Sequence, residues 1–156
     1  MRDNIWLDRK LSEIWEKHFS DVPRGNEVYI KFGRDARTRL GSIRKIGKSS
    51  TLITITGYFK DERVPDFMVE ATIAHELCHY AHGFFSPLPR LSRHPHQGGL
   101  VDNELKTRGF SGQLKAQKKW LKEVWPKIIG MRVRRRRIMR KKQYSGVNIL
   151  KFLISN

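Results

Sequence analysis

The feature that most constrains this chain is a pair of histidines four residues apart, inside an apolar stretch that runs from Val64 to Gly83. Apolar residues in this stretch recur at steps of three and four, which predicts one buried stripe along a helix. These residues are Phe67, Ala71, Ala74, Leu77, Cys78 and Ala81. Pro65 suits the first turn of such a helix, and Gly83 suits the position just after its end. The stretch is therefore expected to fold as one buried helix.

His75 and His79 would lie one turn apart on the same side of this helix, because residues four apart are neighbours on a helix. Two imidazoles in this arrangement can bind one divalent metal ion, and Glu76 beside them need not be a ligand. This is the His-Glu-x-x-His pattern of zinc hydrolases, in which zinc acidifies a water molecule and the glutamate acts as general base. We therefore predict Zn²⁺ as cofactor, His75 and His79 as ligands, and Glu76 as the catalytic residue. The alternative is a buried helix whose histidines form hydrogen bonds elsewhere.

A catalytic zinc site needs a third protein ligand and one position left for water. His96 is the preferred candidate, because it stands just before a new helix or turn that can fold back over the metal helix. His94 and Glu104 stay open as alternatives, the second as a carboxylate donated by a downstream helix. His82 lies two turns after His75, roughly 10 Å away, which is too far for both to share one ion. We interpret His82 as lining the cleft or supporting the ligands.

The chain around this helix predicts an α+β fold, with a small antiparallel β-sheet packed against helices and the metal helix at the centre. The expected elements are helices over 3–19, 98–105 and 111–129 and strands over 28–32, 39–45 and 51–56. Asp3 or Asn4 can cap the first helix, and Pro126 should kink or end the last one. The short spacing of the strands favours antiparallel hairpins over a sheet with helical crossovers.

The chain has 156 residues and a formal net charge of +17, and much of this charge lies near its end. From Val124 to Asn156 there are ten Lys or Arg residues and no acidic residue. This asymmetry predicts a polyanionic partner, most often nucleic acid; an anionic membrane surface and a merely solvated charged face are the alternatives. The helix over 111–129 also carries a basic face. Its residues are Lys115, Lys118, Lys119 and Lys122.

Two parts are therefore expected, a folded domain over 1–130 and a basic extension over 131–156 that contacts nucleic acid. Residues 147–154 suit either a closing strand or a docked helix. A single cysteine, Cys78, excludes an internal disulfide framework and a cysteine-rich zinc ribbon, and its place in the helix indicates a buried side chain. The first residues are too polar for a secretory signal, and no apolar stretch is long enough to cross a bilayer. We expect a monomer in the cytoplasm, associated with the nucleoid or the nucleus.

The run from Thr72 to Ala81, reading TIAHELCHYA, resembles the signature of the SprT-like (Spartan-type) zinc metalloprotease domain. The family signature is close to HELCHA, and a third histidine follows in a short HGxxF-like element. His96-Gln97-Gly98-Gly99-Leu100 is the nearest match to that element, with Gln97 and Leu100 in place of the usual glycine and aromatic residue. Counting residues from His79 instead favours His94. The resemblance covers roughly residues 4–129.

The resemblance implies a zinc-dependent protease with protein substrates. Known members of the family degrade proteins crosslinked to DNA, so it also implies DNA as a partner and a role in DNA–protein crosslink repair. Two other functions stay open. One is a non-catalytic nucleic-acid-binding module in which a fourth protein ligand closes a structural zinc site. The other is a metal-dependent hydrolase of a small molecule, which needs a deep, narrow, mostly apolar pocket.

Overall fold

The computed structural model describes residues 1–131, 134, 138 and 139. The chain divides into two compact units, Met1–Gln117 and Lys118–Asn156. All of the predicted site residues belong to the first unit. The boundary predicted after residue 130 stays a prediction, and the strand or helix considered for 147–154 lies outside the described residues.

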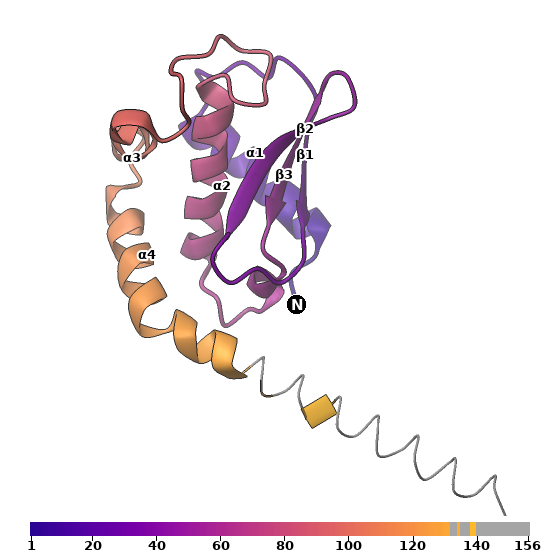
Figure 1. Cartoon of the computed structure of the whole chain (residues 1–156), viewed down its shortest axis with the longest axis vertical. Helices are drawn as coiled ribbons and strands as arrows, with labels where there is room; N and C mark the ends of the chain where they lie inside the picture. Colours follow the sequence, from indigo (N-terminus) through magenta and orange to yellow (C-terminus); the bar gives the residue numbers. More distant parts are fainter. Residues whose placement is uncertain (132–133, 135–137, 140–156) are drawn as a thin grey trace, which may run out of the picture. The chain divides into compact units, whose positions relative to one another are not determined.

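The first unit has an α+β fold with a small three-stranded sheet (Figure 1). In chain order its elements are α1 (Asn4–His18), β1 (Val28–Phe32), β2 (Gly41–Ile46), β3 (Ser50–Ile55), the 3₁₀ turn η1 (Gly57–Lys60), α2 (Asp66–Ala81), the 3₁₀ turn η2 (Gln97–Gly99) and α3 (Leu100–Thr107). Helix α4 (Ser111–Glu123) begins in this unit and continues into the second. The predicted first helix and the three predicted strands are confirmed to within two residues at each end.

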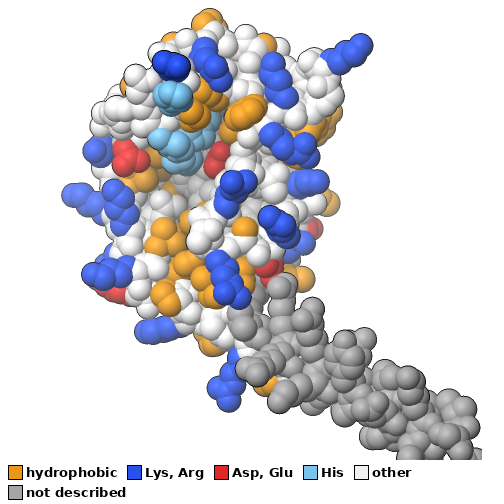
Figure 2. Space-filling view, in the orientation of Figure 1, with side chains coloured by type: hydrophobic (Ala, Val, Ile, Leu, Met, Phe, Trp, Pro, Cys, Tyr) orange, Lys and Arg blue, Asp and Glu red, His pale blue; other side chains and the backbone are white. Residues whose placement is uncertain are grey.

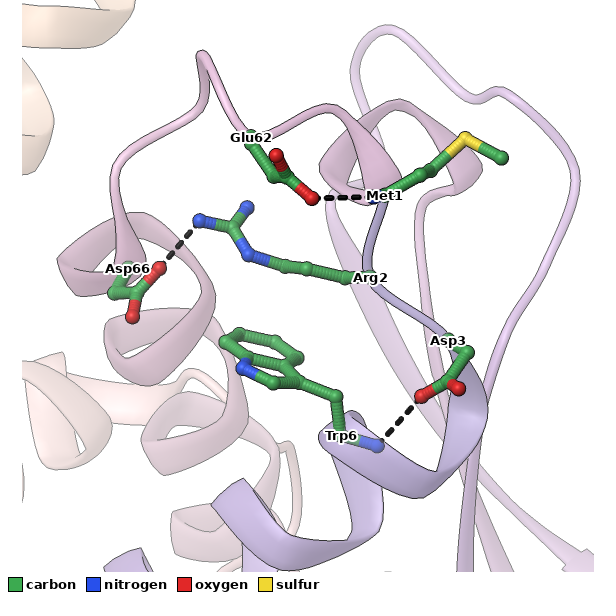
Figure 3. Close-up of a pocket in the computed structure, with 6 residues that line it drawn as sticks. All are labelled: Met1, Arg2, Asp3, Trp6, Glu62 and Asp66. Atoms are coloured by element: carbon green, nitrogen blue, oxygen red, sulfur yellow. Dashed lines mark hydrogen bonds and ion pairs between the residues drawn. The ribbon is translucent and has the colours of Figure 1, made fainter.

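Helix α1 begins at the cap that its sequence predicts. Oδ1 of Asp3 accepts a hydrogen bond of 2.8 Å from a backbone N–H of the first turn. Just before the cap, the buried Arg2 side chain donates to the carbonyls of Phe59 and Val64 at 3.0 and 2.8 Å and forms an ion pair with Asp66 (Figure 3). Arg2 thereby ties the start of α1 to the segment that leads into α2.

The sheet is mixed, so the prediction of an antiparallel sheet was wrong for one of its two strand pairs. The strand order is β1-β3-β2, in which β3 is antiparallel to β2 and parallel to β1. The connection over 33–40 joins β1 to β2 and leaves a gap one strand wide between them, and β3 fills this gap. This connection is bound to the end of β3, since Gly33 N–H donates to Ile55 O at 2.8 Å and Ala36 exchanges two hydrogen bonds with the Thr56 hydroxyl.

One face of the sheet builds the core beneath the helices. Ile30, Ile53 and Ile43 lie opposite one another in the strand register, and each is at most 8% exposed. Helix α1 packs against β1, and α2 packs against β2 and β3. Helix α2 is buried over more of its circumference than the predicted stripe, and the added apolar residues are Met68, Val69, Ile73 and Tyr80. Two residues of the predicted stripe, Phe67 and Ala81, are only half-buried. Full burial of one such side chain stabilises by about 1.5–3 kcal/mol, so tertiary packing fixes the position of α2.

Helix α4 ends at Glu123, and the chain turns at Val124 before it becomes helical again over 125–131. Pro126 explains the break, because proline lacks an N–H and its ring clashes with the carbonyl four residues earlier. The predicted interruption is therefore confirmed. Among the helices that the structure describes, none is both long enough and apolar enough to cross a membrane.

Candidate metal centre

His75 and His79 face each other from the last two turns of α2, with their Nε2 atoms 3.2 Å apart. Two nitrogens that bind one zinc ion in a tetrahedral site, each about 2.05 Å from the ion, lie about 3.3 Å apart. The observed separation therefore fits two ligands of one ion. It also fits an N–H···N hydrogen bond between two neutral imidazoles, so a third residue has to decide between these interpretations.

His96 approaches the pair from the loop that follows α2. One ring nitrogen from each of the three histidines lies within 4.8 Å of the others. The centre of the His96 ring is 5.3 Å from that of His75 and 4.7 Å from that of His79. Two and three residues after His96, Gly98 and Gly99 adopt φ angles of 61° and 71° and turn the chain into α3. Glycine adopts this left-handed conformation without steric cost. The three histidines therefore lie close enough together to bind a metal ion.

The other two candidates for the third ligand lie outside this cluster among the described residues. Glu104 is occupied elsewhere, because its Oε1 accepts from Arg108 Nε at 2.7 Å and its Oε2 faces His82 Nε2 at 3.7 Å. His94 is exposed, and its ring is not part of the cluster. His82 is only 3% exposed and is directed at Glu104, on the side of α3. Of the three candidates, the structure brings only His96 to the histidine pair.

Burial keeps the two helix histidines neutral at physiological pH. It lowers the pKa of His75 to about 4, and the neighbouring charge of His96 acts in the same direction. It lowers the pKa of His79 to about 3, with His75 and His96 adding to the effect. Only the neutral imidazole has a lone pair for a metal, so both rings are in the protonation state that a ligand needs. Nδ1 of His79 is buried without a hydrogen-bond partner among the described residues, so no protein group orients this ring from behind.

Glu76 follows His75 in helix α2, and its side chain lies against strand β2. It is 5% exposed, and Gly41 approaches it so closely that a Cβ at that position would fall 2.5 Å from Glu76 Oε1. Burial raises the pKa of Glu76 to about 8, and the positive charge of Arg39 opposes part of this rise. A carboxyl group with a pKa near neutral pH can both accept and donate a proton during a reaction, as a general base requires.

Sequence reasoning missed Gly41 and Arg39 as neighbours of Glu76. A signal for Gly41 exists, because a glycine in a strand often marks the close approach of another group. No local signal separates Arg39 from the many other basic residues of the chain. Figure 2 shows the histidine side chains gathered on one face of the molecule, with Lys and Arg side chains around them.

The three histidines lie close enough together to bind a metal ion, and helix α2 also carries the buried carboxylate of Glu76. Comparison of the chain with models of protein families, with curated proteins and with solved structures finds no match. The function of the site is therefore inferred from its chemistry.

Proposed function

We propose that this chain is a zinc-dependent protease with a zincin-like centre, similar to SprT-like proteases, and that it acts on proteins bound or crosslinked to DNA. The observation that carries the proposal is the convergence of three histidine nitrogens at helix α2, which also carries the buried carboxylate of Glu76. Zinc is the metal that such a set of nitrogen ligands favours, and a site with three protein ligands leaves a position for water.

His75, His79 and His96 would hold the ion through their ring nitrogens. Zinc bound there supplies a Lewis acid, which polarises a peptide carbonyl and lowers the pKa of water to about 7. Glu76 moves the proton: its carboxylate accepts a proton from the attacking water and then donates it to the nitrogen of the leaving amine.

Strand β2 supports a polypeptide as the substrate. It is an edge strand of the described sheet, and its first residue, Gly41, contacts the Glu76 carboxylate. An extended peptide can add a strand to an exposed sheet edge, and here the added strand would pass beside Glu76. The third ligand candidate, His96, is exposed, which suits a long substrate better than a small molecule enclosed in a deep pocket.

The charge of the chain supports DNA as a partner. The formal net charge is +17, and the lysines of the basic face of α4 are all exposed. Binding through phosphate contacts falls steeply with salt and shows little preference for base sequence. The rival interpretation, a non-catalytic module with structural zinc, needs a fourth protein ligand, whereas the described residues offer a cluster of three.

Glu76→Gln tests the proposal, because it removes the base without removing a ligand. The zinc-loaded chain is incubated with a generic DNA-binding protein, with and without single-stranded DNA. We expect cleavage by the natural sequence and a loss of at least about 100-fold in rate for Glu76→Gln, with zinc content unchanged. Glu70→Gln is the matched control on the same helix, where Glu70 forms an ion pair with Lys10 at 3.3 Å, and it should cleave normally.

Two outcomes would contradict the proposal. Cleavage by Glu76→Gln, with zinc shown to be bound, would exclude Glu76 as the base. A natural chain that binds zinc and DNA but cleaves no protein would instead favour the non-catalytic module.

A further inference from the structure

The three candidate ligands differ in how firmly they are held. His75 and His79 belong to a buried helix, whereas His96 lies on an exposed loop. The first part of this loop is tied to the rest of the unit, since the hydroxyls of Thr51 and Ser86 donate to the carbonyls of Phe85 and Tyr80 at 2.6 and 2.7 Å. Leu91 N–H donates to His82 O at 3.1 Å, whereas the bond from Gln97 N–H to His94 O, at 3.2 Å, lies at the end of the loop, close to His96. After His96 come only the short turn η2 and then helix α3, so the position of His96 depends on where α3 is held.

Arg108, at the end of α3, anchors this helix to the end of α1. Its side chain is 12% exposed, and its Nε donates to Glu104 Oε1 at 2.7 Å. One terminal nitrogen donates to the carbonyl of His18 at 2.5 Å and to Asp21 Oδ1 at 2.6 Å, and the other donates to Asp21 Oδ2 at 2.9 Å. The guanidinium also lies 4.3 Å from the centre of the Phe19 ring. The planar fork of arginine can make all of these contacts at once, and lysine cannot.

The same network reaches the end of α2 through Glu104. One Glu104 oxygen is held by Arg108, and the other faces Nε2 of the buried His82 at 3.7 Å, just past the end of α2. Val101 and Leu105 of α3 are fully buried. Helix α3 is thus joined by one set of contacts to the ends of α1 and α2, four residues after His96.

We infer that Arg108 is a positioning residue for the metal centre, which sets the place of His96 by fixing α3. The inference rests on the metal site of the proposed function and not on protease activity. It implies that loss of Arg108 weakens metal binding through His96 alone, because His75 and His79 are held independently by the core.

The test measures the affinity of the full chain for Co²⁺, whose absorption spectrum also reports the ligand geometry, and for Zn²⁺ by competition. Arg108→Ala is expected to weaken binding 10–100-fold, as for other changes that release a metal ligand from its support. In a chain that already carries His96→Ala, adding Arg108→Ala should change the affinity by no more than about twofold. His94→Ala should leave the effect of Arg108→Ala unchanged.

Arg2→Ala is a matched control for a general loss of stability (Figure 3). Arg2 is also a buried arginine that donates to backbone carbonyls and pairs with a carboxylate, and it lies 4.8 Å from the centre of the Trp6 ring. It ties together the starts of α1 and α2, whereas the metal ligands lie near the end of α2. Arg2→Ala should lower the melting temperature as Arg108→Ala does and leave metal affinity unchanged. If Arg108→Ala does not fold, Arg108→Lys replaces it, with a smaller loss of affinity in the same direction.

Equal affinity of the natural chain and the folded Arg108 variant would overturn the inference. So would an equal loss of affinity when His96 is already absent, because Arg108 would then act on the whole fold. A natural chain that binds neither Co²⁺ nor Zn²⁺ would overturn both this inference and the proposed function. Metal binding that follows the expected pattern, without any cleavage of protein, would support the inference while rejecting the protease.

Discussion

Replacing Gly41 by alanine tests whether strand β2 fixes the carboxylate of Glu76, the proposed general base. The added Cβ would lie 2.5 Å from Glu76 Oε1 and 2.8 Å from Thr72 Cγ2. Non-bonded heavy atoms reach their most favourable separation at about 3.5–4.0 Å, so the carboxylate would have to move by about 1 Å. Glu76 is buried and cannot make this move by swinging into water.

The size of the effect follows from this clash. Overpacking of a buried site costs about 1–3 kcal/mol of stability. At roughly 2–4 °C per kcal/mol for a chain of this size, the melting temperature should fall by about 2–12 °C. A displacement of about 1 Å in a reacting group costs about 100-fold in rate. The three atoms nearest to the new methyl group belong to Glu76 and Thr72 and not to a candidate ligand, so the zinc content should not change.

Circular dichroism on heating, zinc analysis and the rate of protein cleavage measure these three quantities. Gly112→Ala is the matched control, since it lies in the first turn of α4 and no heavy atom of the described residues would lie within 4 Å of its Cβ. Alanine for glycine in a helix should stabilise that variant by about 0.5–1 kcal/mol. Unchanged melting and unchanged cleavage in Gly41→Ala would show that Glu76 does not lie against β2.

Two further predictions concern pH and the end of the chain. Folding raises the pKa of Glu76 from 4.5 to about 8, so the metal-free protein holds this proton more tightly than the unfolded chain and loses stability as pH rises from 4.5 to 8. About 2 kcal/mol of that loss of stability falls between pH 6.5 and 8. Urea unfolding in the presence of a chelator measures it, and the Glu76→Gln variant should not show this loss of stability. Below pH 6.5 the lowered pKa values of His75 and His79 oppose this trend, because the unfolded chain binds their protons more tightly. Deleting residues 131–156 should weaken binding to single-stranded DNA and reduce its salt dependence, measured by fluorescence anisotropy; an unchanged affinity would assign the DNA contacts to the remaining residues.

Features decided by local sequence were predictable. The spacing of apolar residues, with Pro65 before the helix and Gly83 after it, indicated α2, and the helix geometry then put His75 and His79 on one side. Capping by Asp3 and the break near Pro126 follow equally from the chemistry of single residues. In each case the deciding interaction spans only a few residues.

Features decided by distant contacts were not predictable in the same way. The parallel pairing of β1 with β3 depends on how the connection over 33–40 is bound to the end of β3, which the spacing of the strands does not reveal. His94 and His96 flank the same proline, and only the fold of the following segment separates them. Arg108 pairs with Asp21, which lies 87 residues earlier in the chain, so no periodicity connects them.

Helix α2 is held in place by apolar side chains, and this separates folding from metal loading. Small zinc domains collapse when their ion is stripped, because the ion supplies their folding energy. Here the metal-free protein should stay folded, so a chelator would remove the metal from the proposed site without unfolding the chain, and added zinc would fill the site again. If the proposed zinc site is the active centre, the supply of zinc to chains that have already folded sets how many of them are active.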